Sequence, residues 1–305
     1  MSRFQLLLQI GVYFLLLSFI LGGLFWLNHK GKEITQSQQN SVSDNIQRIQ
    51  DKAQLSDGNG IEAVRPTDTT KPTESQTRSQ ENKGQADDFG TVGSQNHQYL
   101  QSHVFSKLTI EIDYVDSVQP NQNAVNTLLS TLKQYADKPG GIVLSGENSL
   151  QAQGDRYSVQ DLLSIAKKNR STYSQGNAVS LYILYVNGNF ADNPNALGVA
   201  LNSSMFVIFK EKINAATTAL VFASAIEQAV LVHELGHLWG LVNITYQSAI
   251  DHEDNKHTNH SKNSESVMFW AVEDLNVANL LKGGPPYQFD TADREDIEKI
   301  KKGLF

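Results

Sequence analysis

An uninterrupted apolar run stands near the start of the chain. Between residues 4 and 27 there is no charged side chain, and two glutamines and one serine are the polar exceptions. A helix of this length, rising about 1.5 Å per residue, measures about 36 Å and exceeds the hydrocarbon thickness of a bilayer, about 30 Å. Trp26 and the basic residues after it suit a membrane interface. We therefore predict an N-terminal transmembrane signal anchor at residues 1–32.

A long polar stretch follows this run. Residues 33–98 are rich in Gln, Ser, Asn, Thr and Asp and contain few large apolar side chains, too few to offset the entropy lost on ordering. We predict a disordered polar stalk that carries one folded domain, residues 99–305, on the extracytoplasmic side. The positive charges that flank the run are nearly balanced, so the orientation rests mainly on the stalk. A cleaved signal peptide, with an apolar region of about 7–15 residues, is the alternative.

Strand and helix patterns alternate through residues 99–305. Period-two or continuous apolar runs predict five strands, at 108–115, 141–145, 180–186, 197–201 and 205–209. Helical periodicity predicts helices at 120–136, 158–169 and 291–302, the first opened by Pro120 and Asn121 and the other two capped by Ser158 and Asp290. It also predicts a long helix from Thr217 or Thr218 to Leu238. The first strand alternates between apolar and polar residues, as a half-buried strand does. Residues 180–186 form a continuous apolar run, which is typical of a strand buried on both faces. The order predicts an α+β fold with a mixed five-stranded sheet and a loop-rich C-terminal half.

Composition limits the chemistry that this domain can perform. The chain has no cysteine, which excludes disulfides, cysteine-bound zinc, thiol nucleophiles and iron–sulfur clusters. The formal net charge of −7 argues against a phosphate-binding surface, and therefore against nucleic acid as a partner. Any metal site must use histidine, carboxylate, amide or water. Five of the 8 histidines fall between residues 233 and 260, which makes this region the candidate site.

The predicted long helix ends in an HExxH pattern formed by His233, Glu234 and His237. Residues four apart lie on one face of a helix, so the two imidazoles can bind one zinc ion. Glu234 can take a proton from a zinc-activated water and later pass it to a leaving amine. His233 and His237 are therefore candidate metal ligands, and Glu234 is the candidate general base. Gly240, three residues after His237, favours a sharp turn at the end of the helix.

The segment HELGHLWGL resembles the zinc-binding helix of metzincin metallopeptidases, whose pattern is HExxHxxGxxH followed by a methionine turn. The archaemetzincin branch continues its third histidine as H-C-x4-C, with a methionine close behind. This chain has His260, Ser261, Ser266 and Met268 at that spacing, with serine in place of both cysteines. The resemblance implies a metzincin-like zincin domain with His260 as third zinc ligand and Met268 beneath the metal. The cysteine-bound second zinc of that family cannot form here.

The third ligand has several alternatives. The simple metzincin spacing falls on Asn243, and an amide is a poor substitute for imidazole at zinc. His257 lies three residues before His260, and the same loop also carries His252 and Asp251. We favour His260, and these four residues remain open alternatives at the level of sequence.

These observations lead to an expected function. We expect a membrane-anchored zinc metallopeptidase that binds one catalytic Zn²⁺, with a peptide or protein as substrate by resemblance. Two alternatives stay open: a catalytically weak zinc-binding surface module, and a zinc hydrolase that acts on a non-peptide amide. The sequence leaves the cleavage specificity, any latency mechanism and the oligomeric state undetermined.

Overall fold

The computed structural model describes residues 87–115, 118–152, 154–277 and 284–305. The predicted anchor at 1–32 and the predicted stalk up to residue 86 lie outside these ranges. In the part of the chain that the structure describes, no helix combines the length and the apolar character needed to span a bilayer.

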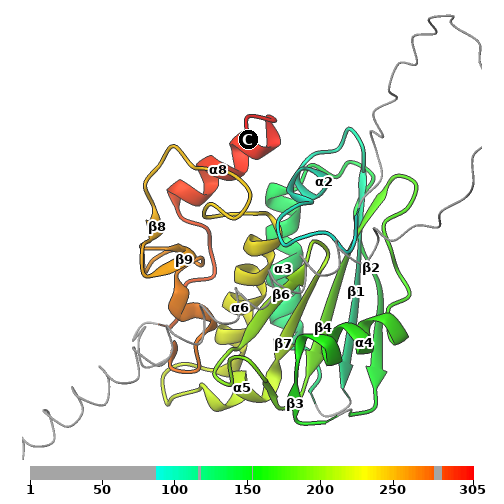
Figure 1. Ribbon diagram of the computed structural model, residues 1–305, viewed down its shortest axis with the longest axis vertical. Helices are drawn as coiled ribbons and strands as arrows, with labels where there is room; N and C mark the ends of the chain where they lie inside the picture. The colour runs from blue at the N-terminus through cyan, green and yellow to red at the C-terminus, as the bar shows by residue number, and fades with distance from the viewer. Residues whose placement is uncertain (1–86, 116–117, 153, 278–283) are drawn as a thin grey trace, which may run out of the picture. The chain divides into compact units, whose positions relative to one another are not determined.

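A five-stranded sheet organises the domain (Figure 1). Its strands in spatial order are β2 (Ile142–Leu150), β1 (Lys107–Val115), β4 (Ala178–Val186), β7 (Met205–Phe209) and β6 (Gly198–Asn202). The first four run parallel, and β6 runs antiparallel to β7 at the edge. The predicted mixed five-stranded sheet is confirmed. The central strand β4 is buried on both faces, as its apolar sequence predicts.

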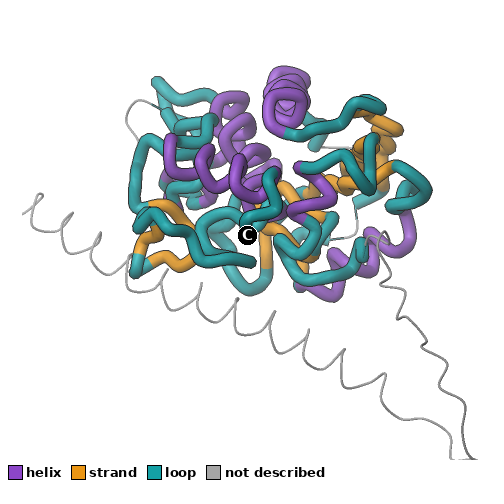
Figure 2. Tube along the Cα trace, turned by 90° about the horizontal axis from the view of Figure 1, so that it is seen from above, coloured by secondary structure: helices purple, strands orange, loops and turns teal. Residues whose placement is uncertain are grey.

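Helices cover both faces of this sheet (Figure 2). α3 (Gln122–Tyr135) joins β1 to β2, and α4 (Val159–Asn169) joins β2 back to β4 on the other side of β1. Because these parallel crossovers run in opposite directions along the sheet, the right-handed rule places the two helices on opposite faces. Both helices begin where their caps predict. The side chain of Asn121 caps α3, and Ser158 forms a capping box with Asp161 at α4.

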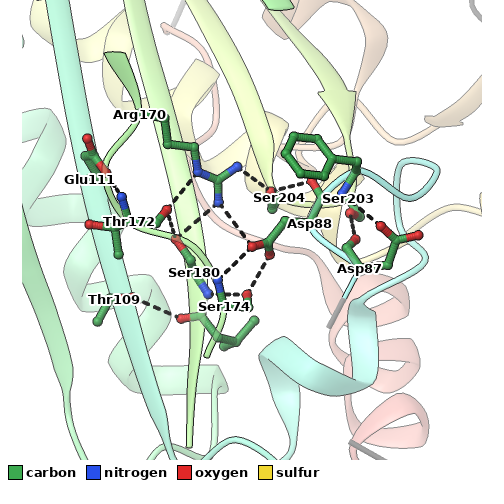
Figure 3. Close-up of polar contacts among 12 residues, drawn as sticks. Asp87, Asp88, Thr109, Glu111, Arg170, Thr172, Ser174, Ser180, Ser203 and Ser204 are labelled. Atoms are coloured by element: carbon green, nitrogen blue, oxygen red, sulfur yellow. Dashed lines mark hydrogen bonds and ion pairs between the residues drawn. The ribbon is translucent and has the colours of Figure 1, made fainter. Parts of the chain in front are cut away.

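The strand β1 differs from its prediction, because both of its faces are buried. The polar residues of its alternation, Glu111 and Asp113, are fully buried. Glu111 accepts hydrogen bonds from the backbone N–H groups of Ser171 and Thr172, and Figure 3 shows Glu111 beside Thr172. Asp113 accepts a hydrogen bond from the Tyr182 hydroxyl at 2.7 Å. The segment that follows α4 therefore covers the face that sequence alternation assigns to solvent.

Residues 87–98, which the sequence analysis assigns to the stalk, pack against this domain. The Asp88 carboxylate accepts hydrogen bonds from Ser174 N and Oγ, both at 2.6 Å, and lies 3.8 Å from the buried Arg170 guanidinium (Figure 3). The short helix α2 (Asn96–Leu100) follows and buries Tyr99 and Leu100. The polar side chains of this segment have partners in loops far along the chain, such as Ser174 and Ser203, which composition alone does not reveal.

The helix that carries the HExxH pattern is α6 (Ala223–Leu238), and it begins later than predicted. A short helix that the sequence analysis missed, α5 (Lys210–Ala215), precedes it. Between the two, the Thr218 hydroxyl accepts hydrogen bonds from the N–H groups of Leu220 and Val221. Such a side-chain turn competes with helix formation and delays the start of α6.

The C-terminal half lies on the side of α6 away from the sheet (Figure 1). It contains an antiparallel pair, β8 (Glu253–Asp254) and β9 (His257–Ser261), where the sequence predicts irregular loop. The 3₁₀ turn η1 (Trp270–Glu273) and the helix α8 (Thr291–Lys301) follow, and Asp290 caps α8 as predicted. A second small pair, β3 (Arg156–Tyr157) with β5 (Asn189–Phe190), lies at the end of the sheet. The site described next lies between α6 and this half.

Candidate metal centre

Two histidines of α6 form the first part of the centre. The helix is apolar around its whole circumference, so it lies in the core, and both His233 and His237 are buried. Their Nε2 atoms lie 3.0 Å apart, as expected for residues four apart that point to one spot. Burial, with the neighbouring His233 and His260, holds the pKa of His237 well below its usual value. The His237 ring is therefore neutral, with a lone pair for a metal ion.

His260 on β9 completes a group of three imidazoles. Its ring centroid lies 5.2 Å from that of His233 and 5.0 Å from that of His237. The structure therefore brings together the three residues that the sequence analysis favours as ligands. One ligand atom from each of them, and one from Glu273, all lie within 4.8 Å of one another.

Backbone carbonyls orient two of these rings. His233 Nδ1 lies 2.7 Å from the carbonyl oxygen of Val267, and His260 Nδ1 lies 2.9 Å from that of Thr258. A carbonyl oxygen only accepts hydrogen bonds, so each Nδ1 must carry the proton. In this tautomer Nε2 is the nitrogen that can bind a metal ion. Metal-binding histidines commonly have their other ring nitrogen hydrogen-bonded in this way.

Met268 lies directly beneath the histidine-bearing helix. A Cβ atom at Gly236, between Glu234 and His237 on α6, would lie 2.3 Å from the Met268 sulfur. The sulfur is therefore in contact with the helix backbone, at a place where only glycine fits. The methionine is fully buried.

Glu234 is a fully buried carboxylate beside the imidazoles. Neither of its oxygens has a hydrogen-bond partner among the described residues. It lies against the start of β6, where a Cβ at Gly198 would be 2.4 Å from Glu234 Oε1. Burial, reinforced by the charge of Glu273, raises the pKa of Glu234 well above its usual value. A buried carboxylate without a protein partner fits a group that exchanges a proton with a bound molecule.

Glu273 is the member of the centre that the sequence analysis missed. Its Oε1 lies 3.3 Å from His260 Nε2, and its Oε2 lies 3.6 Å from His233 Nε2. Burial opposes its charge, but His260 and His233 hold the pKa of the Glu273 carboxyl well below its usual range. The sequence contains one weak signal, an acidic residue that ends the apolar run after Met268.

Two of the alternative ligands support the loop after α6. Asn243 has a positive φ of 66° and donates to Glu253 Oε2 at 2.7 Å, while its Oδ1 accepts the Ser248 N–H. Asp251 is exposed and pairs with Lys262 on the surface. Neither residue belongs to the group of ligand atoms around His233.

The two remaining histidines of the loop also face elsewhere. His257 lies 2.8 Å from Asp254 Oδ2, and its ring stacks on Trp270 with centroids 4.3 Å apart. His252 contacts the carboxylates of α8 and forms a separate group with Asp290 and Asp293. Of the five histidines between residues 233 and 260, three therefore share the centre.

The donor set suits zinc. Three imidazole nitrogens and one carboxylate oxygen are donor types that Zn²⁺ binds in four-coordinate sites, and they are available here without cysteine. The predicted ligands His233, His237 and His260 thus fit the expected metal in residue type and in mutual distance.

Comparisons with known proteins find similarity among solved structures. No protein-family model matches the chain, and no curated protein matches it. Among solved structures, the chain is similar to the crystal structure of archaemetzincin from Methanopyrus kandleri, with a TM-score of 0.44 and 13% sequence identity. The similarity covers 65% of this chain and 97% of that chain.

Proposed function

We propose that this protein is a zinc-dependent metallopeptidase with a metzincin-like catalytic domain. One observation carries the proposal: three imidazoles converge beside a buried carboxylate, Glu234, whose oxygens have no hydrogen-bond partner among the described residues. A purely structural zinc site has no need of such a carboxylate. The metzincin-like assignment also rests on the HExxH spacing and on the contact of Met268 with Gly236 beneath the histidines.

The residues of the centre divide the chemistry between them. His233, His237 and His260 would hold a zinc ion, and hydrogen bonds to backbone carbonyls keep the His233 and His260 rings oriented. When bound, zinc supplies the Lewis acidity that polarises a carbonyl and activates a water molecule. Glu234 would accept a proton from that water and return it to the leaving amine. Its burial favours this exchange, because a carboxylate with a raised pKa is a stronger base near neutral pH.

The edge strand β6 supports a peptide as substrate. Within the described residues β6 pairs with β7 alone, and its first residue, Gly198, lies against Glu234. An extended peptide that added itself to this edge would bring its carbonyl groups past the metal and the base. The membrane anchor and the extracytoplasmic location remain part of the proposal, on the apolar run of residues 4–27 and the polar stretch after it.

A second candidate is a zinc-binding module with weak activity. The observation that favours it is the position of Glu273, whose carboxylate lies among the histidines where a catalytic site keeps an open coordination position. The intact base Glu234 favours the peptidase, and the two candidates differ in whether hydrolysis depends on that residue.

The test uses the full chain, purified in detergent and loaded with zinc. Metal content is measured by mass spectrometry, and hydrolysis is followed with a peptide library and a panel of non-peptide amides. We expect one zinc per chain, and a fall of about 10²–10⁴-fold in peptide hydrolysis for Glu234→Gln with zinc content unchanged. Glu295→Gln on the exposed face of α8 is the matched control and should keep full activity. Loss of stoichiometric zinc binding, or unchanged hydrolysis in Glu234→Gln, would exclude the proposal.

A further inference from the structure

We propose that Glu273 is an internal fourth ligand of the zinc ion, and that it keeps the resting protein latent until a substrate displaces it. The inference rests on the proposed function, because it concerns the regulation of the same centre. Two observations support it: the position of the Glu273 carboxylate, and the backbone pairing of the residues around Glu273.

The distances around the carboxylate match a shared metal ion. In a tetrahedral zinc site with bonds of about 2.0–2.1 Å, two ligand atoms lie about 3.3 Å apart. Glu273 Oε1 lies 3.3 Å from His260 Nε2, and Oε2 lies 3.6 Å from His233 Nε2. The two α6 imidazoles are themselves separated by 3.0 Å. Four donors at these separations would complete a four-coordinate zinc site.

Glu273, and not Glu234, takes this place. Glu234 lies next to His233 in sequence, but it is absent from the group of ligand atoms that lie within 4.8 Å of one another. Its oxygens face the start of β6, whereas those of Glu273 face the histidines. The two carboxylates thus have different roles, one as base and one as ligand.

The backbone around Glu273 holds the carboxylate in place. The Leu197 N–H donates to the Glu273 carbonyl at 2.9 Å, and the Leu275 N–H donates to the Asn195 carbonyl at 3.0 Å. Between them Ala196 and Asp274 form an antiparallel bridge. Residues 273–275 therefore pair as a short strand with residues 195–197, which lead directly into the edge strand β6.

This pairing occupies the place of an incoming peptide. An extended substrate that augments the edge near β6 would need the same backbone N–H and carbonyl groups, and its scissile carbonyl would need the metal position that Glu273 fills. The segment at 273–275 therefore competes with substrate at both points. Only a peptide that replaces both the Glu273 ligand and the backbone pairing of residues 273–275 opens the centre. The latency therefore needs no second protein.

The experiment compares wild type with Glu273→Ala and Leu275→Pro, all as full chains in detergent. Leu275→Pro removes the N–H that bonds Asn195 and keeps the carboxylate. Zinc affinity is measured by competition with a chromogenic chelator. Each protein is also loaded with Co²⁺, and its visible spectrum is followed during titration with azide, a small anion that needs an open coordination position. Glu295→Gln again serves as control.

We expect three results. Glu273→Ala should bind zinc about tenfold more weakly or worse, because it loses one ligand. Its cobalt spectrum should respond to azide at concentrations that leave wild type unchanged. Hydrolysis of a peptide should rise about tenfold in Glu273→Ala and also rise in Leu275→Pro, because the competent fraction of the protein increases.

Two outcomes would contradict the inference. Zinc affinity and azide response equal to wild type in Glu273→Ala would show that Glu273 is no ligand. A peptidase rate that does not rise in either variant would show that the segment does not restrain activity. Failure of the proposed function is distinguishable, because wild type would then bind no stoichiometric zinc, or the rate of Glu273→Ala would survive the additional change Glu234→Gln.

Discussion

At the scale of single residues, two glycines decide how close the parts of the centre approach. Gly236 lets the Met268 sulfur touch α6, and Gly198 lets the Glu234 carboxylate touch β6. Neither Gly198 nor Gly236 has a positive φ. Glycine is therefore required at these two positions because a side chain would not fit, and not because of the backbone conformation. A methyl group added at Gly236 would displace the packed Met268 sulfur, whereas one added at Gly198 would displace the terminal carboxylate of Glu234.

The contact at Gly198 predicts a functional effect with little loss of stability. In Gly198→Ala the new Cβ would meet Glu234 Oε1 at 2.4 Å, and a carboxylate at the end of a side chain can rotate away. We expect hydrolysis to fall at least about tenfold while the thermal midpoint stays close to wild type. Kinetics and calorimetry on the same preparation test this. Gly146→Ala, whose added Cβ would meet its nearest neighbour at 3.6 Å, is the matched control.

The choice of third ligand gives a second prediction at this scale. His260→Ala should weaken zinc binding about 100-fold or more, because it removes a ligand from the group around His233. His257→Ala should leave zinc affinity within about twofold, because its ring stacks on Trp270 and pairs with Asp254. Competition titrations with a chelator measure both. A loss in His257→Ala equal to that in His260→Ala would show that the two histidines exchange roles.

At the scale of elements, α8 holds the segment that carries Met268. The Ser266 hydroxyl donates to Asp293 Oδ2 at 2.5 Å and accepts the Met268 N–H at 2.9 Å. The same Asp293 closes the capping box with Asp290 at the start of α8. Ser266 therefore links α8 to the Met268 backbone by hydrogen bonds.

This link predicts the effect of removing one hydroxyl. Ser266→Ala leaves the buried Asp293 carboxylate and the Met268 N–H with one partner fewer, which costs about 1–3 kcal/mol of unfolding free energy. Chemical denaturation of the zinc-loaded protein measures the change. Ser264→Ala, two residues away on the exposed surface, should stay within about 0.5 kcal/mol of wild type. Equal values for the two variants would exclude this role of Ser266.

At the scale of the whole molecule, a buried histidine joins the loop after α6 to the C-terminal helix. His252 Nε2 lies 3.3 Å from Asp296 Oδ2, and Nδ1 lies 3.6 Å from Asp293 Oδ1. Burial opposes the charge of His252, but the hydrogen bond with Asp296 and the charges of Asp293, Asp296 and Asp290 raise its pKa. Lys299, on the same helix, lies 3.6 Å from Asp296.

These shifts predict a pH dependence of stability. A raised folded-state pKa means that the stabilisation by His252 is complete below its unfolded pKa, about 6.5, and is lost as the pH rises through the folded value. Burial and Asp290 also raise the pKa of Asp293 to about 6, so its ionisation opposes folding in the same direction. We expect the thermal midpoint of wild type to fall between about pH 6 and pH 8.

The control for this dependence is a histidine on the surface. His252→Gln should flatten the change of the thermal midpoint between about pH 6 and pH 8, whereas the exposed His103→Gln should keep it. Calorimetry in zinc-saturated buffers across this range makes the comparison. The same slope in all three proteins would assign the dependence to other groups.

Much of the fold was predictable because its signals are local. The five strands, the helices capped by Asn121, Ser158 and Asp290, and the buried central strand β4 follow from periodicity and capping within a few residues. The burial of Glu111 and the packing of Asp88 were not predictable, because their partners lie about 60 and 86 residues away. From sequence alone, a charged side chain is predicted to be exposed, because the distant segment that covers it is not known.

The sequence by itself determined the two imidazoles and the carboxylate of α6, because three residues within one helical turn and a half have a fixed geometry. Only the tertiary structure selected His260 among the candidates and added Glu273. Both residues reach α6 through chain segments whose course is set by the pairing of β8 with β9 and of residues 273–275 with 195–197. Such pairings join positions far apart in the chain, and no local pattern of side chains encodes the distance between them.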